Sequence, residues 1–105
     1  MPETYKKLYQ GQLAASAGTL YTVPSATQTI IKGIRIVNTD TSDRTVKLWH
    51  DGTADTNLIL PATTIKAGGW GEFDGVITME AADTLSGEAS TASKLTVTIY
   101  GLEVS

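Results

Sequence analysis

The chain has 105 residues, a formal net charge of −3 and no cysteine. A chain of this length forms one domain and buries enough apolar surface for an independent core. The mild acidic balance argues against nucleic acid or an anionic membrane as a partner, because either normally requires a basic patch. Without cysteine, neither disulfides nor thiolate metal sites contribute to stability.

The N-terminal segment alternates only loosely between apolar and polar residues, with Tyr5, Leu8 and Tyr9 among lysines and glutamines. Chain ends are ordered only when something ties them down. We therefore expect residues 1–13 to be an N-terminal arm or edge strand, and we predict that Tyr5–Gln12 is an arm that a partner orders. No apolar run follows Lys6 and Lys7, so no signal peptide is expected. No run approaches the ~20 apolar residues of a membrane span.

The densest run of β-branched residues, 30–37, predicts the central strand of the fold, because Ile and Val pack well on a pleated surface. Read at a period of two, one face carries Ile30, Ile34 and Ile36, interrupted by Lys32. The opposite face carries Ile31, Gly33, Arg35 and Val37. The first face is the expected core side, and the second is only partly exposed to water.

The rest of the chain is divided by turn signals about every ten residues, without any helical period. Pro61 is expected to break one strand, and Asp74-Gly75 to form a turn within another stretch. The inward positions of the clearest strands are Ile34, Ile36, Val46, Leu48, Leu95, Val97 and Ile99. Eight or nine short strands predict an all-β fold, either an antiparallel β-sandwich or a small barrel, that occupies residues 14–105.

Residues that could carry catalysis are better explained by turns. His50-Asp51 is a His–carboxylate neighbour pair, but no serine stands in a Gly-x-Ser-x-Gly context. We interpret the pair as a strand-end histidine followed by a turn aspartate, and we expect no catalytic residue.

Two further motifs have the same explanation. Asp40, Asp43, Asp51 and Asp55 lie in two loops without the spacing of a calcium loop. The run 68–71 is glycine-rich but lacks the Lys-Ser or Lys-Thr pair of a phosphate-binding loop. We expect no metal and no cofactor.

Large apolar side chains outside the expected core are candidates for a protein interface. Trp49 and Tyr100 point away from the Leu, Val and Ile positions of their strands. Such aromatics can anchor a protein interface, stack on sugar rings, or cover the second sheet of a sandwich. The candidate interface residues are Tyr5, Leu8, Tyr9, Trp49, Trp70 and Tyr100.

Several short motifs follow one another in a recognisable order between Leu13 and Glu103. They are Leu20-Tyr21-Thr22-Val23-Pro24, a strand that ends in Asn38-Thr39, an Ala67-Gly68 turn, Glu80-Ala81-Ala82-Asp83-Thr84 and Gly101-Leu102-Glu103. In this order the motifs resemble small virion proteins of tailed bacteriophages.

The resemblance implies a jelly-roll-like β-sandwich that forms an oligomer (a dimer or trimer) on the virion and is made in the host cytoplasm. The first expectation is a capsid decoration (cement) protein, whose partner is the major capsid protein. The alternatives are a tail, baseplate or fibre-associated component with tail proteins as partners, and, from a different class, a carbohydrate-binding adhesin module. The resemblance carries no catalytic residues.

Overall fold

The computed structural model describes residues 3–105, apart from the side chains at positions 75 and 76. Nearly every described segment outside the turns is a β-strand, as the abundance of β-branched residues predicts. The strands are β1 (Glu3–Gln12), β2 (Gly18–Thr22), β3 (Gln28–Asn38), β4 (Arg44–His50), β5 (Leu58–Ile65), β6 (Trp70–Met79), β7 (Thr84–Ala89) and β8 (Leu95–Val104). A single 3₁₀ turn, η1 (Asp55–Asn57), precedes β5 in this part of the chain.

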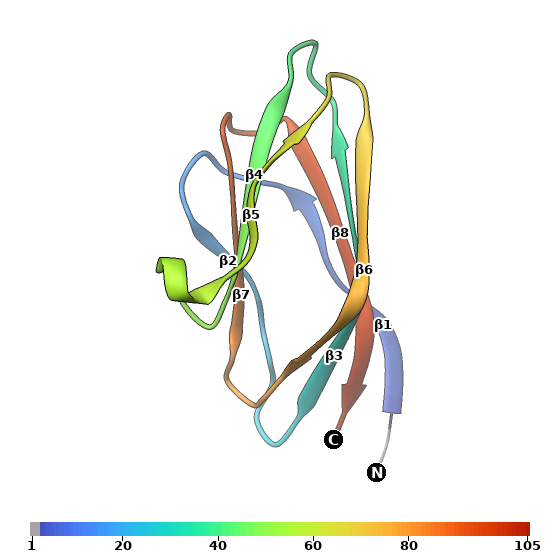
Figure 1. The fold of residues 1–105 in the computed structure, drawn as a ribbon. Helices are drawn as coiled ribbons and strands as arrows, with labels where there is room; N and C mark the ends of the chain where they lie inside the picture. The colour runs from blue at the N-terminus through green and yellow to red at the C-terminus, as the bar shows by residue number, and fades with distance from the viewer. Residues whose placement is uncertain (1–2) are drawn as a thin grey trace.

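The strands form two four-stranded antiparallel sheets that face each other (Figure 1). The first sheet has the order β1-β8-β3-β6, and the second has the order β2-β7-β4-β5. Strand β1 pairs with β8, β2 with β7, β3 with β6 and β4 with β5, as in one long hairpin rolled up on itself. This is the jelly-roll topology. The predicted all-β sandwich of about eight strands is confirmed.

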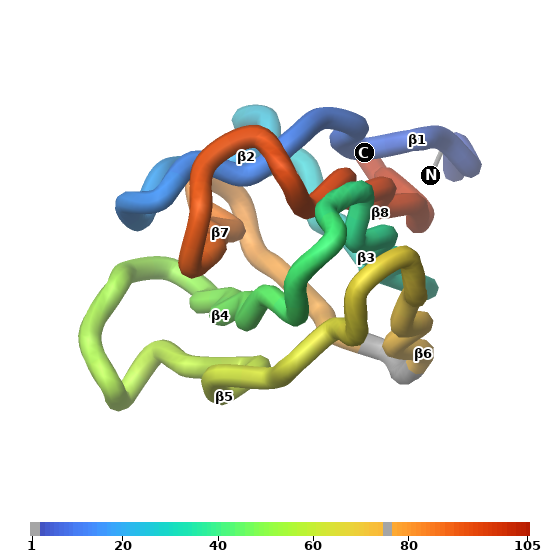
Figure 2. Tube along the Cα trace, turned by 90° about the horizontal axis from the view of Figure 1, so that it is seen from above, coloured from blue at the N-terminus to red at the C-terminus, as the bar shows by residue number. Residues whose placement is uncertain are grey.

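The core lies between the two sheets, which appear as separate layers when viewed from above (Figure 2). All seven predicted core side chains are at most 3% exposed, so that prediction is confirmed. Each such side chain contributes roughly 1.5–3 kcal/mol through burial. The alternation in β8 is the clearest, because Leu95, Val97 and Ile99 are fully buried while the residues between them are not.

The assignment of faces along β3 is right for one half of the strand and wrong for the other. Ile34 and Ile36 face the core as expected, but so does Ile31, which is 1% exposed, whereas Ile30 is only half-buried. The reason is a β-bulge, because the register to both neighbouring strands shifts between Ile31 and Gly33. A bulge adds one residue and so moves every side chain beyond it to the other face.

Two expected strand breaks are also wrong. β5 continues through Pro61, and β6 continues through Asp74. Both are edge strands of their sheets. The register to β4 shifts between Leu60 and Thr63, so Pro61 lies at a bulge of an edge strand, where a proline is tolerated.

Residues 3–12 form edge strand β1, which pairs with β8 along its whole length. Leu13, directly after it, is 1% exposed in the core. Residues 3–12 are therefore an edge strand of the domain. They do not form the arm ordered only by a partner that was the alternative prediction. The backbone hydrogen bonds to β8 and the burial of Leu13 tie this end of the chain down.

Candidate protein interface

The histidine and its neighbouring carboxylates hold turns together. His50 Nε2 lies 2.9 Å from Asp83 Oδ2, and the same oxygen accepts a hydrogen bond from the Glu80 N–H. The Glu80 N–H and, second, His50 lower the pKa of Asp83 below its usual value. Asp51 has a positive φ of 58° and belongs to the following turn, as expected. The contact between His50 and Asp83 fixes the end of β4 to the β6–β7 turn.

The loop aspartates Asp40 and Asp43 also accept hydrogen bonds from backbone N–H groups. Arg44 and, second, the Thr41 N–H lower the pKa of Asp40 through hydrogen bonds. Asp43 accepts the N–H of Ala67 at 2.9 Å. The described residues contain no group of three or more His, Cys, Asp or Glu side chains that could hold a metal ion.

The glycine-rich run at 68–71 forms a turn and the start of β6. Gly68 has a positive φ of 66°, a conformation that glycine adopts without strain. The Gly69 N–H closes the turn by donating to the Lys66 carbonyl at 2.8 Å. No helix follows to complete a phosphate site.

Three candidate interface residues are strongly exposed, and all three lie on the outer face of the first sheet. Tyr5 is 76% exposed, Trp70 58% and Tyr100 40%. Directly paired residues point to the same side of a sheet. Trp70 pairs with Val37 and Tyr100 with Gly33, both on the side opposite the buried Ile34 and Ile36. We call the surface made by Tyr5, Trp70 and Tyr100 the aromatic face.

One end of the aromatic face is hollowed. The hollow has a volume of about 500 Å³ and is lined by Tyr5, Lys6, Lys32, Tyr100 and Gly101. The Tyr100 ring lies directly over Gly33, because a Cβ added there would come within 2.5 Å of the ring. An apolar floor with an exposed tyrosine and two lysines at its border is a shape that a partner side chain can fill.

At the other end of the aromatic face, Arg35 contacts both Trp70 and Glu72. The Arg35 guanidinium stacks over the Trp70 ring at 4.3 Å from its centre. Arg35 Nη1 also lies 3.8 Å from Glu72 Oε2. The Arg35 guanidinium therefore covers part of the Trp70 ring, while more than half of the Trp70 surface stays exposed.

The other three candidate residues do not join this face. Trp49 was expected to be an exposed aromatic, which is wrong, since only 5% of it is exposed. It does point away from the core, because it pairs with Ser86 and alternates with Leu48. The connection from β4 to β5 projects on this outer side of the second sheet (Figures 1 and 2).

Leu8 and Tyr9 are half-buried and pack against the domain's own core. A register shift between Lys7 and Tyr9 turns this part of β1 inward. The loose alternation of the N-terminal segment was the sequence signal of that bulge, but it did not indicate where the bulge would fall.

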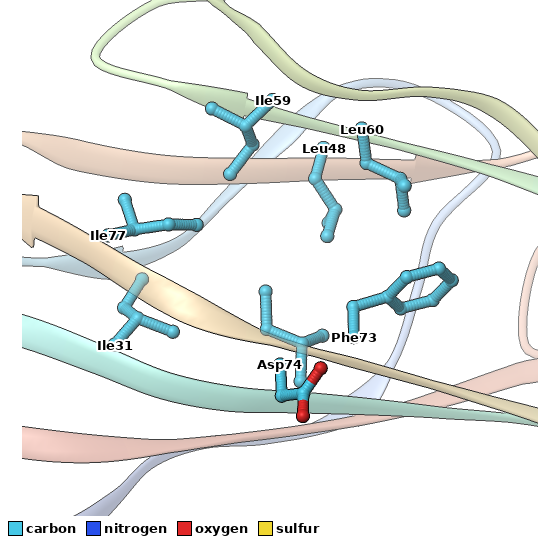
Figure 3. A pocket seen from close by; sticks show the side chains of 8 residues that line it. Ile31, Leu48, Ile59, Leu60, Phe73, Asp74 and Ile77 are labelled. Carbon is cyan, nitrogen blue, oxygen red and sulfur yellow. The ribbon is translucent and has the colours of Figure 1, made fainter.

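An apolar cleft opens between the two sheets on the side where β5 and β6 are the edges. Figure 3 shows Ile59 and Leu60 on one side of it, facing Phe73 and Ile77 on the other. The cleft has a volume of about 280 Å³, and Asp74 is the one charged residue among the described residues that line it. It can accept an apolar side chain.

A polar contact that the sequence did not reveal ties the sheets together at one end. The Tyr21 hydroxyl of β2 donates to Glu103 Oε2 of β8 and lies 2.8 Å from Thr29 Oγ1 of β3. Lys6 of β1 reaches the other oxygen of Glu103 at 3.2 Å. Burial and, second, the bond to Glu103 raise the pKa of Tyr21 to about 12. We call these four residues the tyrosine clasp.

Solved structures of similar fold include subunits of virus particles and of a bacterial appendage. A chain of the Helicobacter pylori bacteriophage KHP30 capsid has a TM-score of 0.54 at 13% identity, covering 99% of this chain and 98% of that one. A chain of the infectious bursal disease virus particle has a TM-score of 0.58 at 9% identity, covering 97% of this chain and 30% of that one.

A subunit of the Bacillus endospore appendages, which are disulfide-linked pili, has a TM-score of 0.56 at 16% identity, covering 98% of this chain and 88% of that one. These similarities show that the fold is shared. No family model and no curated protein matches the sequence. Within the described residues, no helix is long and apolar enough to cross a membrane.

Proposed function

We propose that this protein is a non-enzymatic structural component of a tailed-bacteriophage virion, where it decorates the assembled head and binds the major capsid protein. The observation that carries this proposal is the aromatic face, which leaves three large aromatics exposed on one side of a jelly roll. The order of sequence motifs and the likeness to a phage capsid chain support the virion as the location.

The mechanism is mechanical. Exposed aromatics on a rigid sheet bury a large area at little cost in side-chain entropy, which is why they dominate protein interfaces. A surface formed by neighbouring capsid subunits exists only in the assembled shell. A protein that binds this surface stabilises the shell by mass action, since it does not bind the separate subunits.

The test uses heads from a phage from which the gene for this protein has been deleted. Purified protein is added back, and its occupancy on the heads is measured against concentration. We expect Tyr5→Ala to weaken binding by about 30-fold or more, which corresponds to a hot-spot loss of ~2 kcal/mol. The melting temperature should stay nearly unchanged, because Tyr5 is 76% exposed.

Thr64→Ala is the matched control, since Thr64 is exposed on the second sheet. Normal head binding by Tyr5→Ala would contradict the assigned face. Binding of the wild-type protein to tails and not to heads would make it a tail or baseplate component.

One observation favours a carbohydrate-binding adhesin as the second candidate, namely the hollow between Tyr5 and Tyr100. Aromatic side chains beside an apolar floor can stack on sugar rings. A glycan array with the wild-type protein and Tyr5→Ala tests this function directly. Glycan binding that the substitution abolishes, together with no binding to heads, would establish it in place of decoration.

A further inference from the structure

We propose that copies of this chain associate edge to edge, so that β1 of one copy pairs with β6 of the next and continues the first sheet. This inference concerns how copies join one another, and it holds whichever particle the protein decorates. It is based on the length, charge and direction of the two edge strands.

The edges of the two sheets differ in how well they are protected against pairing. In the second sheet, β2 has only five residues and β5 carries Pro61. In the first sheet, β1 and β6 have ten residues each and no proline. Short strands, prolines, bulges and lysines all protect an exposed edge. β1 has a bulge between Lys7 and Tyr9 and carries two lysines, but with ten residues it still presents a row of backbone groups to a further strand.

The charges of the two long edges are largely complementary. β1 carries Glu3 as well as Lys6 and Lys7, whereas β6 carries only the acidic residues Glu72 and Asp74. Pairing β6 with β6 would bring carboxylates together, whereas pairing β1 with β6 places two lysines on the edge beside two carboxylates. Neither Lys7 nor Asp74 forms an ion pair within the described residues.

The direction of the strands suits this contact. Neighbouring strands in the order β1-β8-β3-β6 are antiparallel throughout, so β1 and β6 run in opposite directions. A second copy displaced sideways within the plane of the sheet therefore presents its β1 antiparallel to β6. Such a head-to-tail contact leaves one free edge on each copy for the next copy. Repeated addition gives an open row, or a closed ring if the copies are rotated relative to one another.

The apolar cleft provides a further reason for the contact. It opens beside β6, and half-buried Leu60 and Phe73 line it (Figure 3). A strand added to β6 extends the first sheet across this side of the sandwich. The added strand removes part of the cleft lining from water, which favours association.

The chain has no cysteine, so single introduced thiols report the contact without background. The test mixes Lys7→Cys with Asp74→Cys protein, adds a short bismaleimide cross-linker and measures the mass of the products. We expect cross-linked dimers in the mixture and none with either variant alone. The double variant K7C/D74C should give a ladder or a closed ring.

Several outcomes would overturn the proposal. Cross-linking of Asp74→Cys alone would indicate β6–β6 pairing, and cross-linking of Lys7→Cys alone would indicate β1–β1 pairing. No product in the mixture, together with no self-association of the wild-type protein in sedimentation at concentrations up to about 1 mM, would exclude an association of even a few kcal/mol. Ser16→Cys, at an exposed loop position, replaces Lys7→Cys as the matched control and should give no dimer with Asp74→Cys.

A second measurement does not depend on cross-linking geometry. In sedimentation, Lys7→Glu should weaken self-association, and K7E/D74K should restore it because both charges are reversed together. Equal weakening by the single and double variants would contradict the charge argument. Normal occupancy of heads without any self-association would refute edge pairing and leave the proposed function intact.

Discussion

The outer faces of the two sheets carry one tryptophan each, and the two tryptophans have opposite environments. Trp70 on the first sheet is 58% exposed, whereas Trp49 on the second is 5% exposed. Both point away from the shared core. The second sheet buries its tryptophan within the chain, while the first leaves three aromatics in water. Exposed aromatics are common where proteins interact, so the first sheet is the side on which we propose a partner contact.

The largest expected effect comes from the two tryptophans themselves. Trp49→Ala should lower the free energy of unfolding by about 3–5 kcal/mol, as truncation of a buried tryptophan does. Trp70→Ala should lower it by about 0.5–1 kcal/mol, since mainly the stacking of exposed Arg35 is lost. Urea unfolding of both variants measures the difference. Equal losses of unfolding free energy in the two variants would mean that Trp49 is no more buried than Trp70.

Two glycines give the next contrast. A Cβ at Gly101, inside the first sheet, would lie 2.2 Å from the Ile30 carbonyl oxygen, whereas a Cβ at Gly18 in the second sheet meets nothing within 4 Å. Gly101→Ala should therefore cost about 1–3 kcal/mol through forced backbone movement. Gly18→Ala, its matched control, should stay within about 0.5 kcal/mol. Thermal unfolding of both proteins tests this, and a neutral Gly101→Ala would show that β3 and β8 separate easily.

The tyrosine clasp joins the two sheets, so its removal tests how strongly they depend on each other. Tyr21→Phe deletes the hydroxyl that binds Glu103 and Thr29. The expected loss is about 1–3 kcal/mol, because one partner is a carboxylate and the other, Thr29, is fully buried. Tyr5→Phe is the matched control, since Tyr5 is 76% exposed. Equal stability of the two variants would contradict a role for the clasp.

The sequence was sufficient for the fold class because the strands of the core alternate regularly. Val46, Leu48 and the inward residues of β8 alternate with outward residues at a period of two. The sequence pattern alone therefore identifies their buried side. The failures fall at bulges and edges. The bulge in β3 after Ile31 depends on pairing with two other strands, and Pro61 is tolerated at a bulge in an edge strand.

The candidate interface was harder to predict for the same reason. Periodicity gave the direction of Trp49 and Tyr100 correctly, but exposure depends on what else lies on that face. Trp49 is buried and Tyr100 is 40% exposed, although both alternate with core residues. That Tyr5, Trp70 and Tyr100 share one side of the first sheet follows from sheet order, which short strand patterns do not determine.

The smallest expected effect concerns pH and the second sheet. The pKa of Asp83 is lowered in the folded protein by the Glu80 N–H and then by His50. A lowered folded pKa means that the stabilisation is complete above the unfolded pKa of about 3.9 and is lost as the pH falls through the folded value. Asp83→Asn keeps an acceptor for Glu80 but removes the charge. The wild-type protein should therefore be more stable than this variant at pH 7.

The difference between the two proteins should shrink as the pH falls below about 4, because the aspartate then becomes neutral as well. Urea unfolding from pH 7 to pH 2 measures this convergence. Asp55→Asn, in the exposed turn η1, is the matched control, since Asp55 forms no ion pair among the described residues. If the free energies of unfolding of the wild type and of Asp83→Asn differed by the same amount at every pH, the charge of Asp83 would not stabilise the end of β4. Packing would then be the source of stability at that end of the second sheet.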